Sequence, residues 1–167
     1  TVNQKFLLPK GRLREPFSAL NRADVICLQE GIDSQEIPYK IQPHQLIITT
    51  KTIAGKPYLL KQISNKIHSI NNNDLELPSP IIALSAIAHP NKFENTLKLN
   101  NVSILYHIAY NDHHFYSIHD INKIVKTCCS NLTQTIITTE KDAVKLSEYL
   151  NIFEYNNIEV FVLPIEM

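Results

Sequence analysis

The second half of the chain alternates short apolar runs with segments in which apolar residues recur every three or four positions. The runs predict β-strands, and the recurring pattern predicts amphipathic helices. The expected strands are residues 80–88, 102–109, 134–138 and 160–163. The expected helices are residues 91–99, 117–129 and 140–150. Because strand and helix alternate strictly, the pattern predicts an α/β fold: a small parallel sheet with helices on both faces.

Two of these helices carry start signals in the sequence. Ser117 is followed three residues later by Asp120, a spacing that resembles a capping box. Thr139 and Asp142 repeat the spacing before the helix expected at residues 140–150, so Thr139 is a plausible N-cap. For Thr139 and Asp142 this structural role is favoured over a functional one.

The first part of the chain holds one further helix and strand. Pro16 suits the first turn of a helix that runs through residues 19–23. The unbroken apolar tetrad at residues 25–28 predicts a buried parallel strand.

The region between these two parts has a different character. Residues 37–58 carry three prolines and short β-rich runs, which predict two or three strands in an antiparallel ribbon. Residues 58–70 have helical spacing and end in a polar turn at residues 71–74. We therefore expect a linker between two α/β pieces.

Composition excludes several classes of function. The 167 residues hold 16 Lys and Arg against 16 Asp and Glu, so no net field attracts nucleic acid. The longest apolar run is too short to cross a bilayer, and we expect no signal peptide. The three cysteines are odd in number and lack C-x-x-C spacing, which favours reduced thiols in a cytosol. A first residue that is Thr suggests processing or a piece of a longer protein.

The densest group of titratable residues follows the strand expected at residues 102–109. Asp112, His113 and His114 lie in the loop before the next helix, and Asp120 lies within that helix. Open α/β sheets place their chemistry at the carboxyl ends of strands. Imidazole titrates near neutral pH, so an adjacent carboxylate can tune it as a base. The alternative is a loop histidine that caps a helix or bonds a carbonyl, and Asp112 can equally be a turn residue.

A metal site is a competing interpretation of the same region. Its candidate ligands are His107, Asp112, His113, His114, His119 and Asp120. On a strand followed by a loop these side chains point in different directions, and no H-E-x-x-H motif is present. We therefore expect no metal ligands here.

Three stretches together resemble the tetraacyldisaccharide 4'-kinases, which phosphorylate the lipid A precursor of Gram-negative bacteria. They are residues 7–16 followed by residues 22–24, residues 112–116 with Asp120, and residues 138–146. The order and spacing of these stretches make the match specific, and it covers the whole chain but only the C-terminal portion of the family's length. The resemblance implies transfer of the γ-phosphoryl group of ATP, with Mg²⁺, to the 4'-hydroxyl of a lipid disaccharide.

The same resemblance assigns the domains and the site. Residues 1–36 would be the end of the nucleotide-binding α/β domain, residues 37–77 a β-ribbon linker, and residues 78–167 the C-terminal α/β domain. In the family the D-H-H histidine takes the proton from the sugar hydroxyl. In the family this histidine pairs with an aspartate that lies upstream; by position His113 matches the histidine, with His114 as the second choice. Asp112 is the carboxylate within this sequence that would orient the imidazole, with a turn residue as the alternative.

Phosphate contacts are implied for Arg14 and His114. Arg14 stands just before a helix start, a position that suits a phosphate or a salt bridge with Glu15. A solvated loop arginine is the alternative for Arg14. Lys141 and Lys145 are expected to face solvent.

The sequence lacks the family's phosphate-binding loop. No G-x-x-x-x-G-K-[ST] string occurs among the 167 residues, so ATP and Mg²⁺ have no visible cradle. We therefore expect no activity from this chain alone. An inactive remnant, a module that binds lipid or a partner, and one half of a split kinase are the alternatives. The expected partners are the lipid disaccharide, the cytoplasmic face of the inner membrane and a separate N-terminal half, but not nucleic acid.

Overall fold

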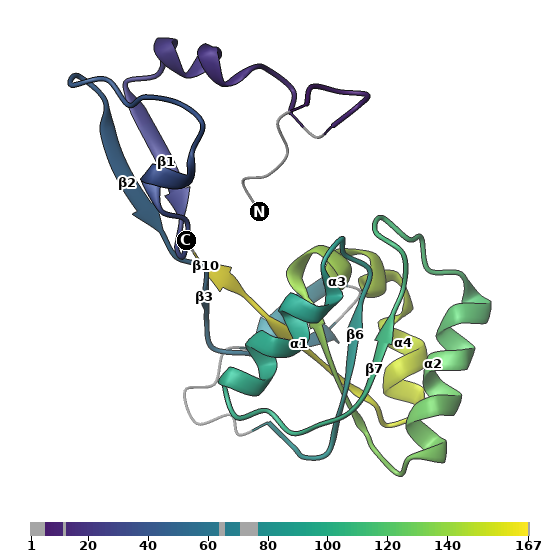
Figure 1. The fold of residues 1–167 in the computed structure, drawn as a ribbon. Coiled ribbons are helices and arrows are strands. Elements are labelled where there is room, and N and C mark those ends of the chain that lie inside the picture. The colour runs from purple at the N-terminus through teal and green to yellow at the C-terminus, as the bar shows by residue number, and fades with distance from the viewer. Residues whose placement is uncertain (1–5, 12, 64–65, 71–76, 167) are drawn as a thin grey trace. The chain divides into compact units, whose positions relative to one another are not determined.

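The computed structural model describes residues 6–11, 13–63, 66–70 and 77–166. The chain forms two compact units, residues 1–52 and residues 53–166. Figure 1 shows a pair of strands in the first unit and a layered arrangement of helices and strands in the second.

The first unit is built on two parallel strands, β1 (Val25–Gln29) and β2 (Leu46–Thr50). They are preceded by the 3-10 helix η1 (Phe17–Arg22), and η2 (Ser34–Glu36) lies in the connection between them. Gln45 is buried and ties the strands to η1, because its Nε2 donates to the carbonyls of Leu20 and Ala23 at 2.7 and 2.8 Å.

Three expectations for this unit need correction. The helix expected through residues 19–23 is a 3-10 helix that begins at Phe17, with Pro16 as its N-cap. The strand at residues 25–28 is parallel as expected, but its burial alternates: Ile26 and Leu28 are buried, whereas Val25 is 46% exposed. The antiparallel ribbon is wrong, since β2 pairs in parallel with β1.

The second unit contains a six-stranded sheet in the order β5-β4-β9-β8-β6-β7. Its members are β4 (Tyr58–Ile63), β5 (Lys66–Ile70), β6 (Ile81–Ser85), β7 (Ile104–Ala109), β8 (Thr135–Thr139) and β9 (Glu159–Leu163). The strands β6 to β9 are parallel, and β4 is antiparallel to both β5 and β9. A short antiparallel pair, β3 (Ile53–Ala54) with β10 (Ile165–Glu166), lies outside the sheet. The expected α/β class is confirmed, but the sheet is parallel-rich instead of purely parallel, because β4 and β5 add an antiparallel edge.

Helical spacing at residues 58–70 gave the wrong prediction, because the segment forms the hairpin β4–β5. Leu59 and Leu60 explain the difference. They are adjacent, yet Leu59 joins one hydrophobic core and Leu60 joins the other. Successive side chains of a strand point to opposite faces, so a strand between two buried layers is apolar at consecutive positions.

Helices cover both faces of the sheet (Figure 1). On one face lies α1 (Pro90–Leu99), whose Phe93 and Leu97 pack against Ile81, Ala83 and other residues of the smaller core. On the opposite face lie α2 (Ile118–Ser130), α3 (Glu140–Leu146) and α4 (Leu150–Tyr155). None of the helices in the described part of the chain has the length and apolar character needed to cross a membrane.

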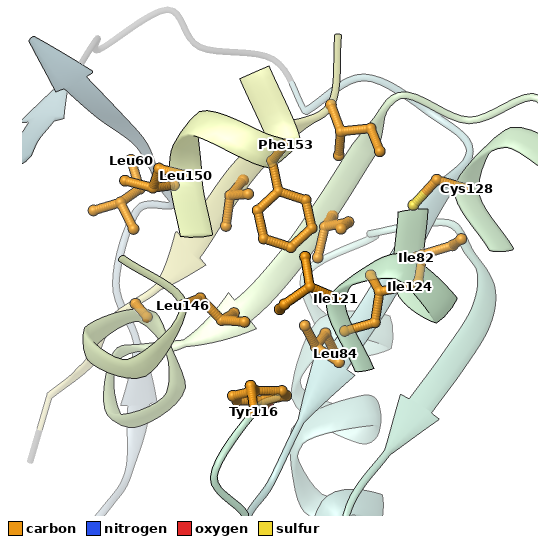
Figure 2. Packing of buried hydrophobic residues seen from close by; sticks show 14 of the residues in the cluster. Leu60, Ile82, Leu84, Tyr116, Ile121, Ile124, Cys128, Leu146, Leu150 and Phe153 are labelled. Carbon is orange, nitrogen blue, oxygen red and sulfur yellow. The ribbon is translucent and has the colours of Figure 1, made fainter. Parts of the chain in front are cut away.

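The larger core lies under α2, α3 and α4, and Figure 2 shows Phe153 in the middle of it. Phe153, Ile121 and Ile124 are fully buried against Leu84 and Ile136. Burial of one such side chain contributes about 1.5–3 kcal/mol, so this layer fixes the helices that flank the titratable loop after β7.

The helix expected at residues 140–150 is interrupted. It consists of α3, the 3-10 turn η3 (Ser147–Tyr149) and α4. Ser147 Oγ donates to the carbonyl of Val144 at 2.6 Å, a local bond that competes with the regular helical pattern. Leu146 and Leu150 both remain buried in the larger core across this break.

Candidate functional site

In the sheet, β7 lies on one side of β6 and β8 lies on the other. The direction in which strands are added therefore reverses at β6. Ligands of open α/β sheets bind outside the carboxyl ends of the strands at such a reversal. Three connections meet at this edge of the second unit: the residues after β6, the loop after β7 that carries the two histidines, and the start of α3 after β8. The topology therefore places the histidine loop where a site is expected.

Asp112 and His113 form a tight turn at the tip of this loop. The His113 N–H donates to Asp112 Oδ1 at 3.0 Å, and the His114 N–H donates to the Asn111 carbonyl at 3.1 Å. His113 has a φ of 62°, in the left-handed region that only some turn residues adopt. Its side chain is 75% exposed, and its Nε2 is 3.7 Å from Asp112 Oδ2. His113 is therefore accessible to a substrate but weakly held.

His114 is held much more firmly. Its side chain is 29% exposed, and its Nε2 lies 3.2 Å from Asp120 Oδ2. The ring stacks on Tyr110 with 4.4 Å between centroids, and it meets Tyr116 edge to face with 5.5 Å between centroids. This gives His114 a carboxylate partner and two aromatic walls.

Asp120 belongs to the capping box that begins α2, as its spacing from Ser117 predicted. Its Oδ2 accepts from the Ser117 N–H at 2.9 Å and from Ser117 Oγ at 2.7 Å. These bonds, first the one from the backbone N–H, lower the pKa of the Asp120 carboxyl to about 2. Asp120 is consequently an anion at any pH near neutral.

Two lysines of α3 hold the loop from the other side. Lys141 Nζ donates to Asp112 Oδ1 at 3.0 Å, and this bond keeps the pKa of the Asp112 carboxyl below its ordinary value. Lys145 Nζ donates to the His114 carbonyl at 3.0 Å, and its side chain is only 21% exposed. The expectation that Lys145 faces solvent is therefore wrong, because its ammonium group donates to the backbone carbonyl of His114, which is distant in sequence. Tyr149 adds a third bond, from its hydroxyl to the Tyr116 carbonyl at 2.8 Å.

Asp142 takes part in the expected N-cap of α3 and also bonds to the backbone after β6. Thr139 Oγ1 accepts from the Asp142 N–H at 3.2 Å, which confirms Thr139 as the N-cap of α3. The Asp142 carboxylate is fully buried, and its Oδ2 accepts from Thr139 Oγ1 at 2.8 Å and from the Ala86 N–H at 2.9 Å. It thereby joins the start of α3 to the end of β6.

Tyr110 and Tyr116 complete the walls around His114, and Figure 2 shows Tyr116 at one end of the larger core. Burial raises the pKa of the Tyr116 hydroxyl. Within the described part of the chain neither tyrosine hydroxyl has a hydrogen-bond partner. Both rings therefore act here through their apolar faces.

A second group of polar residues was missed at the sequence level. His107 Nε2 lies 2.9 Å from Ser85 Oγ, and His107 Nδ1 lies 3.1 Å from Glu94 Oε2. Hydroxyl, imidazole and carboxylate in this order resemble an activated serine nucleophile. Ser85 is fully buried, however, and the next amide, that of Ala86, already donates to Asp142 instead of facing an oxyanion. The group therefore ties α1 to the sheet.

This arrangement also separates the residues considered as metal ligands. His107 is engaged by Ser85 and Glu94, whereas His114 and Asp120 pair with each other. Over residues 6–11, 13–63, 66–70 and 77–166 no group of three or more His, Cys, Asp or Glu side chains is arranged to hold a metal ion.

Arg14 lies in the first compact unit, whereas the histidine loop lies in the second. The side chain of Arg14 is exposed. Glu15, which was considered as its salt-bridge partner, pairs instead with Arg22 at the end of η1. The structure thus brings Asp112, His113 and His114 together in one loop, and Arg14 belongs to a separate unit of the fold.

Comparisons with known proteins agree on one family. The sequence matches the family described as Tetraacyldisaccharide-1-P 4'-kinase over residues 1–167. The tetraacyldisaccharide 4'-kinase of Halothermothrix orenii (strain H 168) is 32% identical over 174 residues, which cover 96% of this chain and 45% of the relative. That of Koribacter versatilis (strain Ellin345) is 30% identical over 145 residues, which cover 87% of this chain and 39% of the relative.

A solved structure shares the fold. The "apo" form of LpxK from Aquifex aeolicus in complex with ATP superposes with a TM-score of 0.56 at 23% identity, covering 96% of this chain and 43% of that chain. The chain therefore spans less than half the length of each of these three relatives.

Proposed function

Because this chain belongs to the tetraacyldisaccharide 4'-kinase family, we propose that residues 1–167 supply the base-bearing portion of a lipid kinase. The reaction would transfer the γ-phosphoryl group of ATP to the 4'-hydroxyl of a lipid A disaccharide precursor. The observation that carries the proposal is the histidine loop after β7, whose imidazoles have carboxylate partners at the carboxyl edge of the sheet.

The role of the loop is general-base catalysis. An imidazole nitrogen would accept the proton of the 4'-hydroxyl while the sugar oxygen forms its bond to the γ-phosphorus of ATP and the bond from that phosphorus to the bridging oxygen breaks, so that ADP leaves with the electron pair. His113, oriented by Asp112, is the candidate by position in the motif. His114 has the better support from geometry, since its imidazole contacts a carboxylate at 3.2 Å compared with 3.7 Å for His113.

ATP and Mg²⁺ require groups that these residues do not provide. The 167-residue sequence has no glycine-rich loop ending in Lys-Ser or Lys-Thr, and the acidic groups of the histidine loop are already paired with Ser117, His114 and Lys141. Phosphoryl transfer depends on such a cradle. ATP would therefore be held by residues outside these 167, with Arg14 as a phosphate contact from this chain.

The domain assignment belongs to the same proposal. Residues 1–36 would end the nucleotide-binding domain, residues 37–77 would link it to the C-terminal domain, and residues 78–167 would form that domain. The parallel pair β1–β2, with Val25, Ile47 and Ile48 exposed, is consistent with a sheet that gains further strands from an ATP-binding portion. The enzyme would act on its lipid at the cytoplasmic face of the inner membrane as a peripheral protein.

The test joins this chain to an ATP-binding portion. The 167-residue protein is assayed with ATP, Mg²⁺ and a tetraacyldisaccharide 1-phosphate, alone and fused behind the N-terminal portion of the Halothermothrix orenii relative. We expect no turnover from the chain alone and turnover from the fusion. His113→Ala and His114→Ala fusions then identify the base, which is expected to contribute about 100- to 10,000-fold to the rate. Full activity with both histidines replaced would contradict the proposal.

The genetic context separates the remaining alternatives. A reading frame that continues upstream of Thr1 into a glycine-rich loop indicates a longer single-chain kinase. A second frame that encodes the loop indicates a split enzyme, and stop codons indicate an inactive remnant or a binding module.

A further inference from the structure

We propose that Phe115 is a substrate-contacting residue, whose ring packs against the apolar surface of the acylated disaccharide beside the reacting 4'-hydroxyl. The inference rests on the proposed function, with His113 as the base by its position in the motif. It deepens that function by naming a residue that contacts the lipid acceptor and not ATP.

The first step is the direction of the Phe115 side chain. Its neighbours on both sides, His114 and Tyr116, face inward, since their ring centroids lie 4.4 and 5.4 Å from that of Tyr110. Alternate side chains of an extended segment face opposite sides, so Phe115 points outward. Its exposed fraction of 84% agrees with this direction.

The second step is that the backbone around Phe115 is held in place. Lys145 Nζ donates to the His114 carbonyl at 3.0 Å, and the Tyr149 hydroxyl donates to the Tyr116 carbonyl at 2.8 Å. Phe115 itself belongs to neither hydrophobic core of the second unit. The fold therefore presents this ring to solvent and gains no core packing from it.

The third step is the distance between Phe115 and the base. His113 is 75% exposed and stands two residues earlier, so the two Cα atoms are at most about 7 Å apart. A hydroxyl that donates its proton to the His113 imidazole brings the sugar ring that carries it within reach of the Phe115 ring. An acceptor with two sugars and several acyl chains extends beyond this distance, so it contacts the exposed surroundings of His113.

Those surroundings contain further exposed apolar side chains. Ile118 begins α2 three residues after Phe115 and is 54% exposed. Val144 is 73% exposed and lies one helical turn after Lys141, whose ammonium group contacts Asp112 in the histidine loop. Exposed apolar residues that gather in one region mark binding sites, whereas isolated ones are ordinary. An apolar rim beside a base suits an acylated sugar better than a purely polar acceptor.

The kinase fusion provides the first test. Phe115→Ala should raise KM for the tetraacyldisaccharide 1-phosphate about 5- to 30-fold and change kcat by less than about twofold, because a contact made equally in the ground and transition states is lost. KM for ATP should stay unchanged. Phe115→Leu, which keeps an apolar side chain, should hold KM for the lipid within about threefold of the unaltered fusion.

Tyr155→Ala is the matched control for the kinetic test. It removes a ring that is 87% exposed from the end of α4, which precedes β9 and so lies at the opposite edge of the sheet. KM for the lipid should be unaffected. A Phe115→Ala fusion whose KM for the lipid stays within about twofold of the unaltered value would overturn the proposal.

The second test needs no turnover, because the chain contains no tryptophan. Phe115→Trp places a single indole reporter at the proposed contact. Leu132→Trp places one at a position that is 91% exposed and precedes β8, at the opposite edge of the sheet. Both variants of the 167-residue protein are titrated with phosphatidylglycerol vesicles that contain or lack the tetraacyldisaccharide 1-phosphate.

We expect a blue shift of the tryptophan emission only for Phe115→Trp, and only with the vesicles that contain the acceptor. Equal shifts with both kinds of vesicle would assign Phe115 to a general membrane contact and overturn the proposal.

The two tests separate this proposal from the proposed function. A fusion that turns over, with KM unaltered by Phe115→Ala, refutes the contact and leaves the kinase proposal in place. A fusion without any activity refutes the proposed reaction, and the fluorescence titration then decides alone whether Phe115 contacts the acceptor. In that case the absence of a shift refutes the contact as well.

Discussion

Asp142 shows how one side chain can serve a local and a distant purpose. Its N–H completes the N-cap of α3 with Thr139, and its carboxylate accepts the Ala86 N–H from a residue 56 positions earlier. A buried carboxylate is unfavourable unless its oxygens are paired. At the residue scale the site is therefore held by buried polar groups that are nearly all satisfied.

Replacing Asp142 tests whether its buried carboxylate stabilises the fold through the Ala86 N–H. Asp142→Ala leaves the Ala86 N–H buried without an acceptor, and we expect the free energy of unfolding to fall by about 2–4 kcal/mol. Urea denaturation followed by circular dichroism measures the change. Glu148→Ala, which removes an exposed carboxylate from the neighbouring turn, should change stability by less than about 0.5 kcal/mol. Equal effects for the two variants would contradict the role of Asp142.

The three cysteines differ in how far their thiols are buried, and therefore in how reactive they are. Burial raises the pKa of the Cys128 thiol to about 12, whereas Cys27 and Cys129 are exposed. Because the thiolate is the reactive form, iodoacetamide at about pH 8 should modify Cys27 and Cys129 and spare Cys128. Mass spectrometry of the intact protein should show two additions in buffer and three in urea. Rapid modification of Cys128 in the folded protein would show that α2 opens readily.

At the scale of elements, α3 and the turn after it act as a clamp on the histidine loop. Lys145 and Tyr149 donate to the carbonyls of His114 and Tyr116, and Lys141 donates to Asp112. These three donors come from a segment that follows β8, while the loop follows β7. The segment from α3 to Tyr149 lies beside the histidine loop because of the strand order, and because α2 and α3 pack on the same face of the sheet.

Loss of the Lys145 contact should loosen the loop without unfolding the unit. For Lys145→Met we expect amide hydrogen exchange at residues 111–117 to increase about fivefold, since one hydrogen bond contributes about 1 kcal/mol. Exchange in β6 and β8 should stay unchanged. Lys141→Met, which removes a more exposed ion pair, should have a smaller effect. A larger effect from Lys141→Met would shift the main restraint to Asp112.

At the scale of the whole molecule, the two compact units differ in the cores they contain. The largest fully buried side chains of the described structure all belong to residues 53–166. In the first unit the buried apolar residues among those described are Ile26 and Leu28, at 6% and 8% exposure. A two-stranded sheet with so little buried apolar surface has little independent stability.

Hydrogen exchange of the whole chain should reveal this difference. We expect the amides of β1 and β2 to exchange at least about 100-fold faster than those of β6 and β8, which open only with global unfolding. Mass spectrometry after pulsed labelling resolves the two groups of strands. Equal protection of the four strands would show that the first unit gains stability that its own burial does not explain.

The sequence predicted the regular elements of the second unit well, because their signals are local. Apolar runs marked β6 to β9, and the spacings Ser117 to Asp120 and Thr139 to Asp142 marked the starts of α2 and α3. The histidine loop was also found from sequence, since it follows a predicted strand. Residues 58–70 were misjudged because consecutive apolar residues fit a helix face as well as a strand buried on both sides.

The sequence by itself thus determined the α/β class, the helix caps and the segment that carries the titratable residues, all of which depend on neighbours within a few positions. Only the tertiary structure decided the partners: Asp120 for His114, Lys145 for the loop backbone, Ala86 for Asp142, and Ser85 with Glu94 for His107. Several of these pairs join segments that are distant in sequence, and their geometry follows from the order in which β7, β6 and β8 lie in the sheet. Strand order depends on how whole layers pack, and no local pattern of side chains encodes it.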